Sequence, residues 1–232
     1  MDKTIGVLGG MGPEATVAFF GRLVAATPAE KDQDHFRVVI VNDPRIPDRG
    51  AYLEGRGESP VPALLRAARD LERMGVDLIA IPCNTAHAFL GEIREAVAVP
   101  VLDIVAETVA ALAVALPPAG SPKVGVMATR STVRLRLYQN ALAEKGFEPL
   151  EPDEETQSRV SETIANLKGS RDLRRVGQWM DEAVARFAEQ GASALIYGCT
   201  ELCLAPVQPR LPIFDSTAIL AVAAVREASG AE

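Results

Sequence analysis

The sequence is poor in cysteine, in aromatic residues and in clustered positive charge. Three cysteines among 232 residues are too few for a disulfide framework, so we expect free thiols in a reducing compartment. Aromatic residues make up 5% of the chain, the net charge is −7, and no run of lysine or arginine exceeds a short pair. These features argue against nucleic acid and against an anionic membrane as partners. They do not argue against a small anionic ligand, which responds to the local field of a pocket.

Long apolar runs are also missing. The most apolar stretch, residues 105–116, carries Glu107 and is followed by Pro117 and Pro118, so no segment is expected to cross a bilayer. A strand is predicted from residue 4 onward, which leaves no room for a signal peptide. We therefore expect a cytoplasmic protein. Hydrophobic residues make up 48% of the chain, enough for a substantial core.

Short β-branched runs alternate with segments of helical periodicity along the chain. This alternation predicts an α/β fold with parallel sheets. The predicted strands are residues 4–8, 36–41, 76–81, 99–103, 124–129, 194–197 and 212–215. Four helices are predicted: one begins near residue 13, two cover residues 62–74 and 86–96, and the last ends near residue 116.

The second half of the chain repeats the pattern of the first. Residues 124–129 match residues 5–10, and residues 212–215 match residues 100–103. Between these matches, each half has an apolar run that ends in a cysteine, with a glycine eight residues before it. Three matches in the same order predict two similar Rossmann-like lobes related by a pseudo-two-fold axis. We expect residues 1–116, completed by residues 216–232, to form one lobe and residues 117–215 the other, with a linker over residues 117–122.

The two matched cysteines are Cys83 and Cys199, and both follow predicted parallel strands. Ligands of α/β folds bind beyond these strand ends, so two facing lobes would place the thiols on opposite sides of one cleft. A thiolate and a thiol in that arrangement can remove a proton from one face of a carbon and return one to the other face. Such stereoinversion needs no metal and no cofactor. A helix is predicted to begin after each cysteine, and its N-terminus would favour a thiolate and bind a carboxylate.

Other candidate residues have competing interpretations. Cys203 lies one helical turn after Cys199 in an apolar context and is interpreted as a core residue. His87 could face Cys83, but a supporting hydrogen bond is the favoured interpretation. The cysteines and histidines lack a recognised zinc spacing, so no metal site is predicted. The turn at residues 9–12 (GGMG) lacks the third glycine of the dinucleotide fingerprint, which favours contact with a small carboxylate instead.

Two basic residues are candidates for a substrate carboxylate. Arg49 follows Asp48 in a proline-rich loop; the pair could be an ordinary exposed one, but an arginine near the strand ends is a natural carboxylate ligand. Lys168 is ambiguous, because most lysines are simply solvated.

Four segments together resemble the aspartate/glutamate racemases, which are amino-acid racemases that work without pyridoxal phosphate. They are residues 9–16 (GGMGPEAT), 46–49 (IPDR), 82–87 (PCNTAH) and 198–201 (GCTE). The resemblance spans residues 4–216 and implies an active site between two lobes, an acidic amino acid as substrate, and often a homodimer. It implies that Cys83 and Cys199 are the acid/base pair. The substrate-binding residues that it implies are Met11, Asn84, Thr85 and Thr200 for the α-carboxylate and amine, Arg49 and Lys168 near the distal carboxylate, Thr129 and Thr132 on the wall of the second lobe, and Glu201.

Two departures bear on the branch of this family. The glutamate-specific branch prefers histidine where this chain has Glu201, and Asp-Ser where it has Gly9-Gly10. Both point to the aspartate or broad aspartate/glutamate branch. A hydantoin racemase, a maleate isomerase, a decarboxylase or a catalytically silent amino-acid-binding protein are the alternatives. The choice between aspartate and glutamate, and the preferred enantiomer, stay open.

Overall fold

The computed structural model describes residues 3–117, 120–169, 172–205 and 210–230. The chain forms two compact units, one of Met1–Glu107 with Thr217–Glu232 and the other of Thr108–Ser216. The predicted lobe limits near residues 116 and 216 stay a prediction. Residues 118 and 119 of the predicted linker lie outside the described residues.

The first unit is built on a parallel sheet with the strand order β2-β1-β3. Its strands are β1 (Ile5–Gly9), β2 (Val38–Asn42) and β3 (Leu78–Ala80). The strand predicted over residues 99–103 is reduced to one bridge, between Val101 and Ile79. Pro100 has no N–H to donate, and its carbonyl accepts a hydrogen bond from the Ile79 N–H at 2.8 Å.

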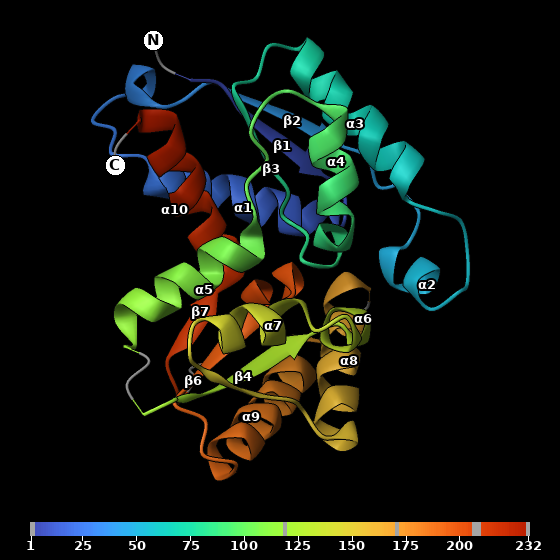
Figure 1. The fold of residues 1–232 in the computed structure, drawn as a ribbon, viewed down its shortest axis with the longest axis vertical. Helices are drawn as coiled ribbons and strands as arrows, with labels where there is room; N and C mark the ends of the chain where they lie inside the picture. Colours follow the sequence, from blue (N-terminus) through green and yellow to red (C-terminus); the bar gives the residue numbers. More distant parts are fainter. Residues whose placement is uncertain (1–2, 118–119, 170–171, 206–209, 231–232) are drawn as a thin grey trace. The chain divides into compact units, whose positions relative to one another are not determined.

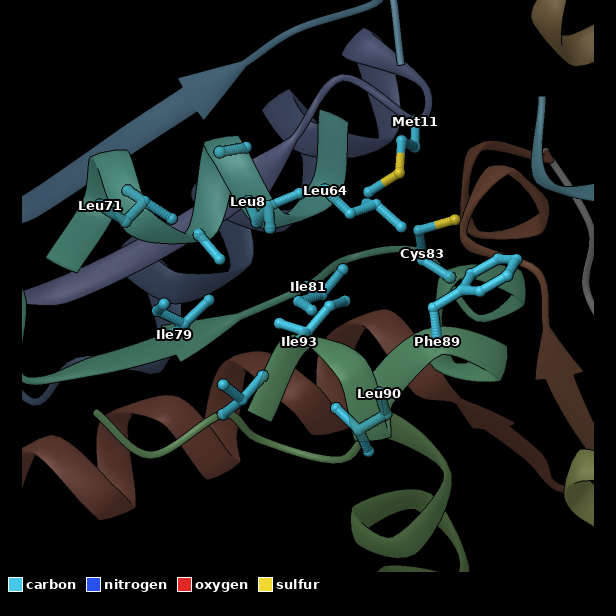
Figure 2. Close-up of a cluster of buried hydrophobic side chains, with 14 of the residues drawn as sticks. Leu8, Met11, Leu64, Leu71, Ile79, Ile81, Cys83, Phe89, Leu90 and Ile93 are labelled. Carbon is cyan, nitrogen blue, oxygen red and sulfur yellow. The ribbon is translucent and has the colours of Figure 1, made fainter. Parts of the chain in front are cut away.

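Helices pack against both faces of this sheet (Figure 1). The helices assigned to this unit are α1 (Pro13–Ala26), η1 (Asp32–Asp34), α2 (Arg49–Leu53), α3 (Val61–Arg73), η2 (Thr85–Phe89), α4 (Leu90–Ala96) and α10 (Ser216–Ser229), and α5 (Ile104–Ala115) continues into the second unit. Pro13 stands at the first position of α1, where its missing N–H costs nothing. Helices α3 and α4 cover one face, where Leu64 and Leu71 meet Leu8, Ile79 and other apolar side chains (Figure 2).

The second unit has a four-stranded parallel sheet with the order β5-β4-β6-β7. Its strands are β4 (Lys123–Ala128), β5 (Glu148–Leu150), β6 (Ala194–Gly198) and β7 (Ile213–Asp215). Both sheets place the first strand of the unit between the second strand and the strand before the cysteine. The predicted α/β fold with two parallel sheets is therefore confirmed.

A glycine in the first strand of each sheet explains part of the repeated pattern. A Cβ atom at Gly125 would lie 2.5 Å from Leu195 Cδ2, and a Cβ atom at Gly6 would lie 3.0 Å from the Leu78 carbonyl oxygen. Only glycine allows these close approaches without a shift of the neighbours.

The helices of the second unit supply its core. They are α6 (Arg130–Arg134), α7 (Leu137–Glu144), α8 (Glu154–Lys168), α9 (Leu173–Glu189) and η3 (Thr200–Leu204). Val160, Met180 and Phe187 from α8 and α9 are buried in one cluster with Leu195 of β6 and Cys199. Within the described ranges, no helix combines the length and apolar character that crossing a membrane requires.

Candidate active site

Cys83 lies just beyond the carboxyl end of β3. Its backbone N–H donates to the Ile81 carbonyl at 2.7 Å, which turns the chain away from the strand direction. The side chain is buried at the end of the first unit's core cluster, close to Met11 and Phe89 (Figure 2). The tertiary structure thus holds this thiol in a largely apolar setting.

A helical segment begins after each cysteine, as predicted, but in both cases it opens as a 3₁₀ helix; η2 then continues into α4, which ends at Ala96. His87 N–H donates to the Asn84 carbonyl, and Leu202 N–H donates to the Cys199 carbonyl, each at 3.0 Å and three residues apart. On the first side, the His87 imidazole, and not its backbone N–H, contacts the Cys83 carbonyl oxygen. A short 3₁₀ turn offers fewer aligned N–H groups than the predicted helix.

His87 is a buried, neutral imidazole that holds backbone in place. Its Nε2 accepts the Ile104 N–H at 3.1 Å, so the proton is on Nδ1, which donates to the Cys83 carbonyl at 3.0 Å. Burial lowers the pKa of His87, and the charge of Asp103 opposes this shift. The favoured interpretation of His87, a supporting hydrogen bond, is confirmed.

The glycine-rich turn after β1 is tied to the loop that carries Arg49. Gly10 has φ +95°, and a Cβ atom there would lie 2.4 Å from the backbone carbon of Asp43. Arg49 Nη2 donates to the Met11 carbonyl at 3.3 Å. Asp48 caps helix α2 by accepting the Ala51 N–H at 2.7 Å, and therefore has a structural task.

Arg49 is 8% exposed and holds a buried donor that no described residue satisfies. Its Nη1 donates to the Pro47 carbonyl at 3.2 Å, but its Nε has no hydrogen-bond partner within the described residues. Among the ion pairs of those residues, none involves Arg49. A buried positive charge with an unused N–H suits a carboxylate ligand.

Cys199 lies at the carboxyl end of β6 and is bonded to a buried carboxylate. Its thiol donates to Glu201 Oε2 at 3.0 Å, and Lys168 Nζ lies 3.5 Å from Glu201 Oε1. Burial raises the pKa of the Cys199 thiol well above its usual value, the charge of Glu201 raises it further, and Lys168 opposes the shift. The expectation that the surroundings favour a thiolate is therefore wrong for Cys199, because a carboxylate lies where a donor was expected.

The remaining predicted residues divide between the two units. Asn84 and Thr85 are buried beside Cys83, and Thr200 is buried beside Cys199. The Thr129 hydroxyl lies 2.9 Å from the Thr132 hydroxyl and accepts the Thr132 N–H at 3.3 Å, which caps α6.

Two findings differ from the sequence interpretation. Cys203, like the other two cysteines, is in no disulfide, but it is half-buried and not a core residue. The contact from Glu201 to the Cys199 thiol was not anticipated; the sequence signal for it is a carboxylate two residues after the cysteine. Among the described side chains, no three His, Cys, Asp or Glu residues group as a metal site requires.

Comparison with known proteins gives consistent results. The profile of the Asp/Glu/hydantoin racemase family matches residues 8–224. The chain is 31% identical, over 95% of its length and 96% of the relative, to the broad specificity amino-acid racemase RacX of Bacillus subtilis (strain 168). Its structure is similar to the aspartate racemase of Picrophilus torridus, with a TM-score of 0.86 and 32% identity over 98% of this chain and 94% of the other. An aspartate racemase homologue from Pyrococcus horikoshii OT3 gives a TM-score of 0.78 and 25% identity, over 98% and 99% of the two chains.

Proposed function

Because this chain belongs to the Asp/Glu/hydantoin racemase family, and is an isomerase of the amino-acid racemase type, we propose that it interconverts L- and D-aspartate or glutamate with Cys83 and Cys199. One thiolate removes the α-proton from one face of the substrate, and the opposite thiol delivers its own proton to the other face. The roles reverse for the other enantiomer. Proton transfer of this kind requires no cofactor and no metal.

The observation that carries this proposal is the equivalent position of the two cysteines. Each is buried and lies beyond the carboxyl end of the corresponding strand, in sheets that have the same strand order. A binding protein without catalysis would need neither thiol at that place. The pairing of the thiols on one substrate, within a site formed by both lobes, is part of the proposal.

Arg49 supports an acidic substrate. Its buried guanidinium with an unused Nε–H suits the side-chain carboxylate of aspartate or glutamate, and a hydantoin would leave that charge without a counter-ion. The similarity to an aspartate racemase favours aspartate, while the similarity to a broad specificity racemase favours a wider range.

The other roles are proposed on the resemblance. Asn84, Thr85, Thr200 and the Met11 turn would bind the α-carboxylate and amine, Lys168 would lie near the distal carboxylate, and Thr129, Thr132 and Glu201 would line the site. A homodimer in the cytoplasm is part of the same proposal, and sedimentation of the purified chain tests its oligomeric state.

The test is racemisation by the purified protein in heavy water without added cofactor. Each enantiomer of aspartate, glutamate and several neutral amino acids is incubated, and chiral chromatography with mass spectrometry follows inversion and α-deuterium. We expect inverted acidic product labelled at the α-carbon. Cys83→Ala and Cys199→Ala should each abolish inversion in both directions, and the losses should not add because the pair acts as a unit.

Cys203→Ala is the matched control, since it removes a thiol without touching the proposed pair. It should keep near-normal racemisation. Near-normal inversion by Cys83→Ala or Cys199→Ala would contradict the two-thiol mechanism, and inversion of neutral amino acids alone would contradict the proposed substrate class.

A further inference from the structure

A buried carboxylate distinguishes the surroundings of the two cysteines. Glu201 is 4% exposed, and its Oε2 accepts a hydrogen bond from the Cys199 thiol, while its Oε1 faces Lys168 Nζ. The Thr200 hydroxyl lies 3.5 Å from the same Oε2. A carboxylate can accept from a thiol but cannot donate to a thiolate, so this contact favours the protonated form of Cys199.

Within the described residues, the charges that act on Cys199 come from two elements. Glu201 belongs to η3, the turn that Cys199 itself opens, and Lys168 is the last residue of α8, which packs against η3. The β6 strand before Cys199 is wholly buried and contributes no charged side chain. Lys168 is 39% exposed in its side chain, so solvent weakens its effect, whereas Glu201 acts within the buried region.

The first unit has no equivalent of Glu201. By the repeat, Thr85 stands two residues after Cys83 as Glu201 stands two residues after Cys199. The nearby titratable group is His87, which is neutral and is bonded to backbone. Within the described residues, no carboxylate accepts from the Cys83 thiol. The two thiols are therefore matched in position but not in electrostatic environment.

We propose that Glu201 is a positioning residue that keeps Cys199 protonated, so that Cys199 is the acid of the resting enzyme. The inference rests on the proposed two-thiol mechanism and deepens it. The resting form takes the enantiomer whose α-hydrogen faces Cys83: the Cys83 thiolate removes that hydrogen, and the Cys199 thiol delivers its proton to the opposite face. Turnover leaves a thiol at Cys83 and a thiolate at Cys199, and proton exchange with solvent restores the resting form.

Thiol reactivity is the measurement that reveals this asymmetry. Free enantiomers have equal energies, so kcat/KM must be the same in both directions whatever Glu201 does. Alkylation, in contrast, reports the thiolate content of each cysteine separately. Iodoacetamide is added to the full chain near pH 7.5, and peptide mass spectrometry follows Cys83, Cys199 and Cys203 in the same molecules.

Two variants should change the alkylation rate of Cys199 in opposite directions. Glu201→Gln removes the negative charge, so Cys199 should react faster, by about threefold for each unit of increased acidity once the lower nucleophilicity is included. Lys168→Gln removes the opposing charge, so Cys199 should react more slowly, by about twofold because Lys168 is partly exposed. The rate of Cys83 should stay within about twofold in both variants, since neither charge belongs to its surroundings.

Opposite changes in the alkylation rate of Cys199 in the two variants, with an unchanged rate at Cys83, support the role of Glu201. An unchanged Cys199 rate in Glu201→Gln, or a parallel rise at all three cysteines, overturns it. If Glu201→Gln does not fold, by circular dichroism, the sign of the change in Lys168→Gln decides. Racemisation is assayed on the wild-type protein, because Glu201 and Lys168 are themselves proposed site residues: an active wild type without the alkylation pattern refutes only the role of Glu201, and the pattern with an inactive wild type refutes the proposed function.

Discussion

Replacing Arg49 by alanine should remove most activity toward acidic amino acids. The guanidinium is 8% exposed and its Nε has no partner within the described residues, so a substrate carboxylate would meet a preformed, desolvated donor. A charge-assisted contact of this kind contributes about 2–3 kcal/mol, which corresponds to a loss of about 30- to 150-fold in kcat/KM. Neutral amino acids should lose much less, because they bring no second carboxylate to the site.

Arg45→Ala is the matched control for this prediction. Arg45 stands in the same loop, but its side chain is 88% exposed and pairs with Asp43 at 2.8 Å. Its loss should leave the kinetics nearly unchanged. Chiral chromatography gives the rates, and thermal unfolding shows whether Arg49→Ala has lost the contacts to Met11 and Pro47 without losing the fold. Unchanged aspartate kinetics in folded Arg49→Ala, or an equal loss for neutral substrates, would refute the assignment.

Three further predictions concern stability and cofactors. The pKa of His87 is lowered in the folded protein, so as the pH falls below about 6.5 the unfolded chain binds a proton at His87 before the folded chain does. The wild type should therefore lose up to about 1.4 kcal/mol of unfolding free energy per pH unit below that pH. Urea titrations of wild type and His87→Asn across pH 5–8 should show this loss only in the wild type. Gly198→Ala should cost about 1–3 kcal/mol, because its Cβ would lie 2.9 Å from the buried Tyr138 ring, whereas Gly21→Ala in open space on α1 should gain about 0.5–1 kcal/mol in the same assay. EDTA and added pyridoxal phosphate should leave the racemisation rate unchanged; loss of activity in EDTA with recovery on adding zinc would contradict a metal-free mechanism.

The alternating pattern, the parallel sheets and the repeat of the first half in the second could be predicted from the sequence. These features depend on local signals: apolar runs of strand length, a glycine eight residues before each cysteine, and turn residues between them. Gly6 and Gly125 belong to the same pattern, since each stands where a neighbouring strand approaches too closely for a side chain. The positions of Cys83 and Cys199 after equivalent strands follow from that regularity.

Other features were decided only by contacts between residues far apart in the sequence or by competition for one backbone group. The helix after Cys83 opens as a 3₁₀ segment, in which the His87 imidazole contacts the carbonyl that the His87 backbone N–H would use in an α-helix. The strand predicted around Val101 shrinks to one bridge beside Pro100. Neither outcome can be read from residue periodicity, which does not say which of two donors a carbonyl will accept.

The electrostatic setting of the candidate site also depends on the tertiary structure. The sequence predicted Arg49 as a carboxylate ligand, but only the fold shows that it is buried with an unused Nε–H. Glu201 and Lys168 are 33 positions apart, and the packing of α8 against η3 brings their charges together beside Cys199. Two cysteines that look alike in the sequence thus have different neighbours, because the proton affinity of a buried thiol is determined by the charges that folding places around it.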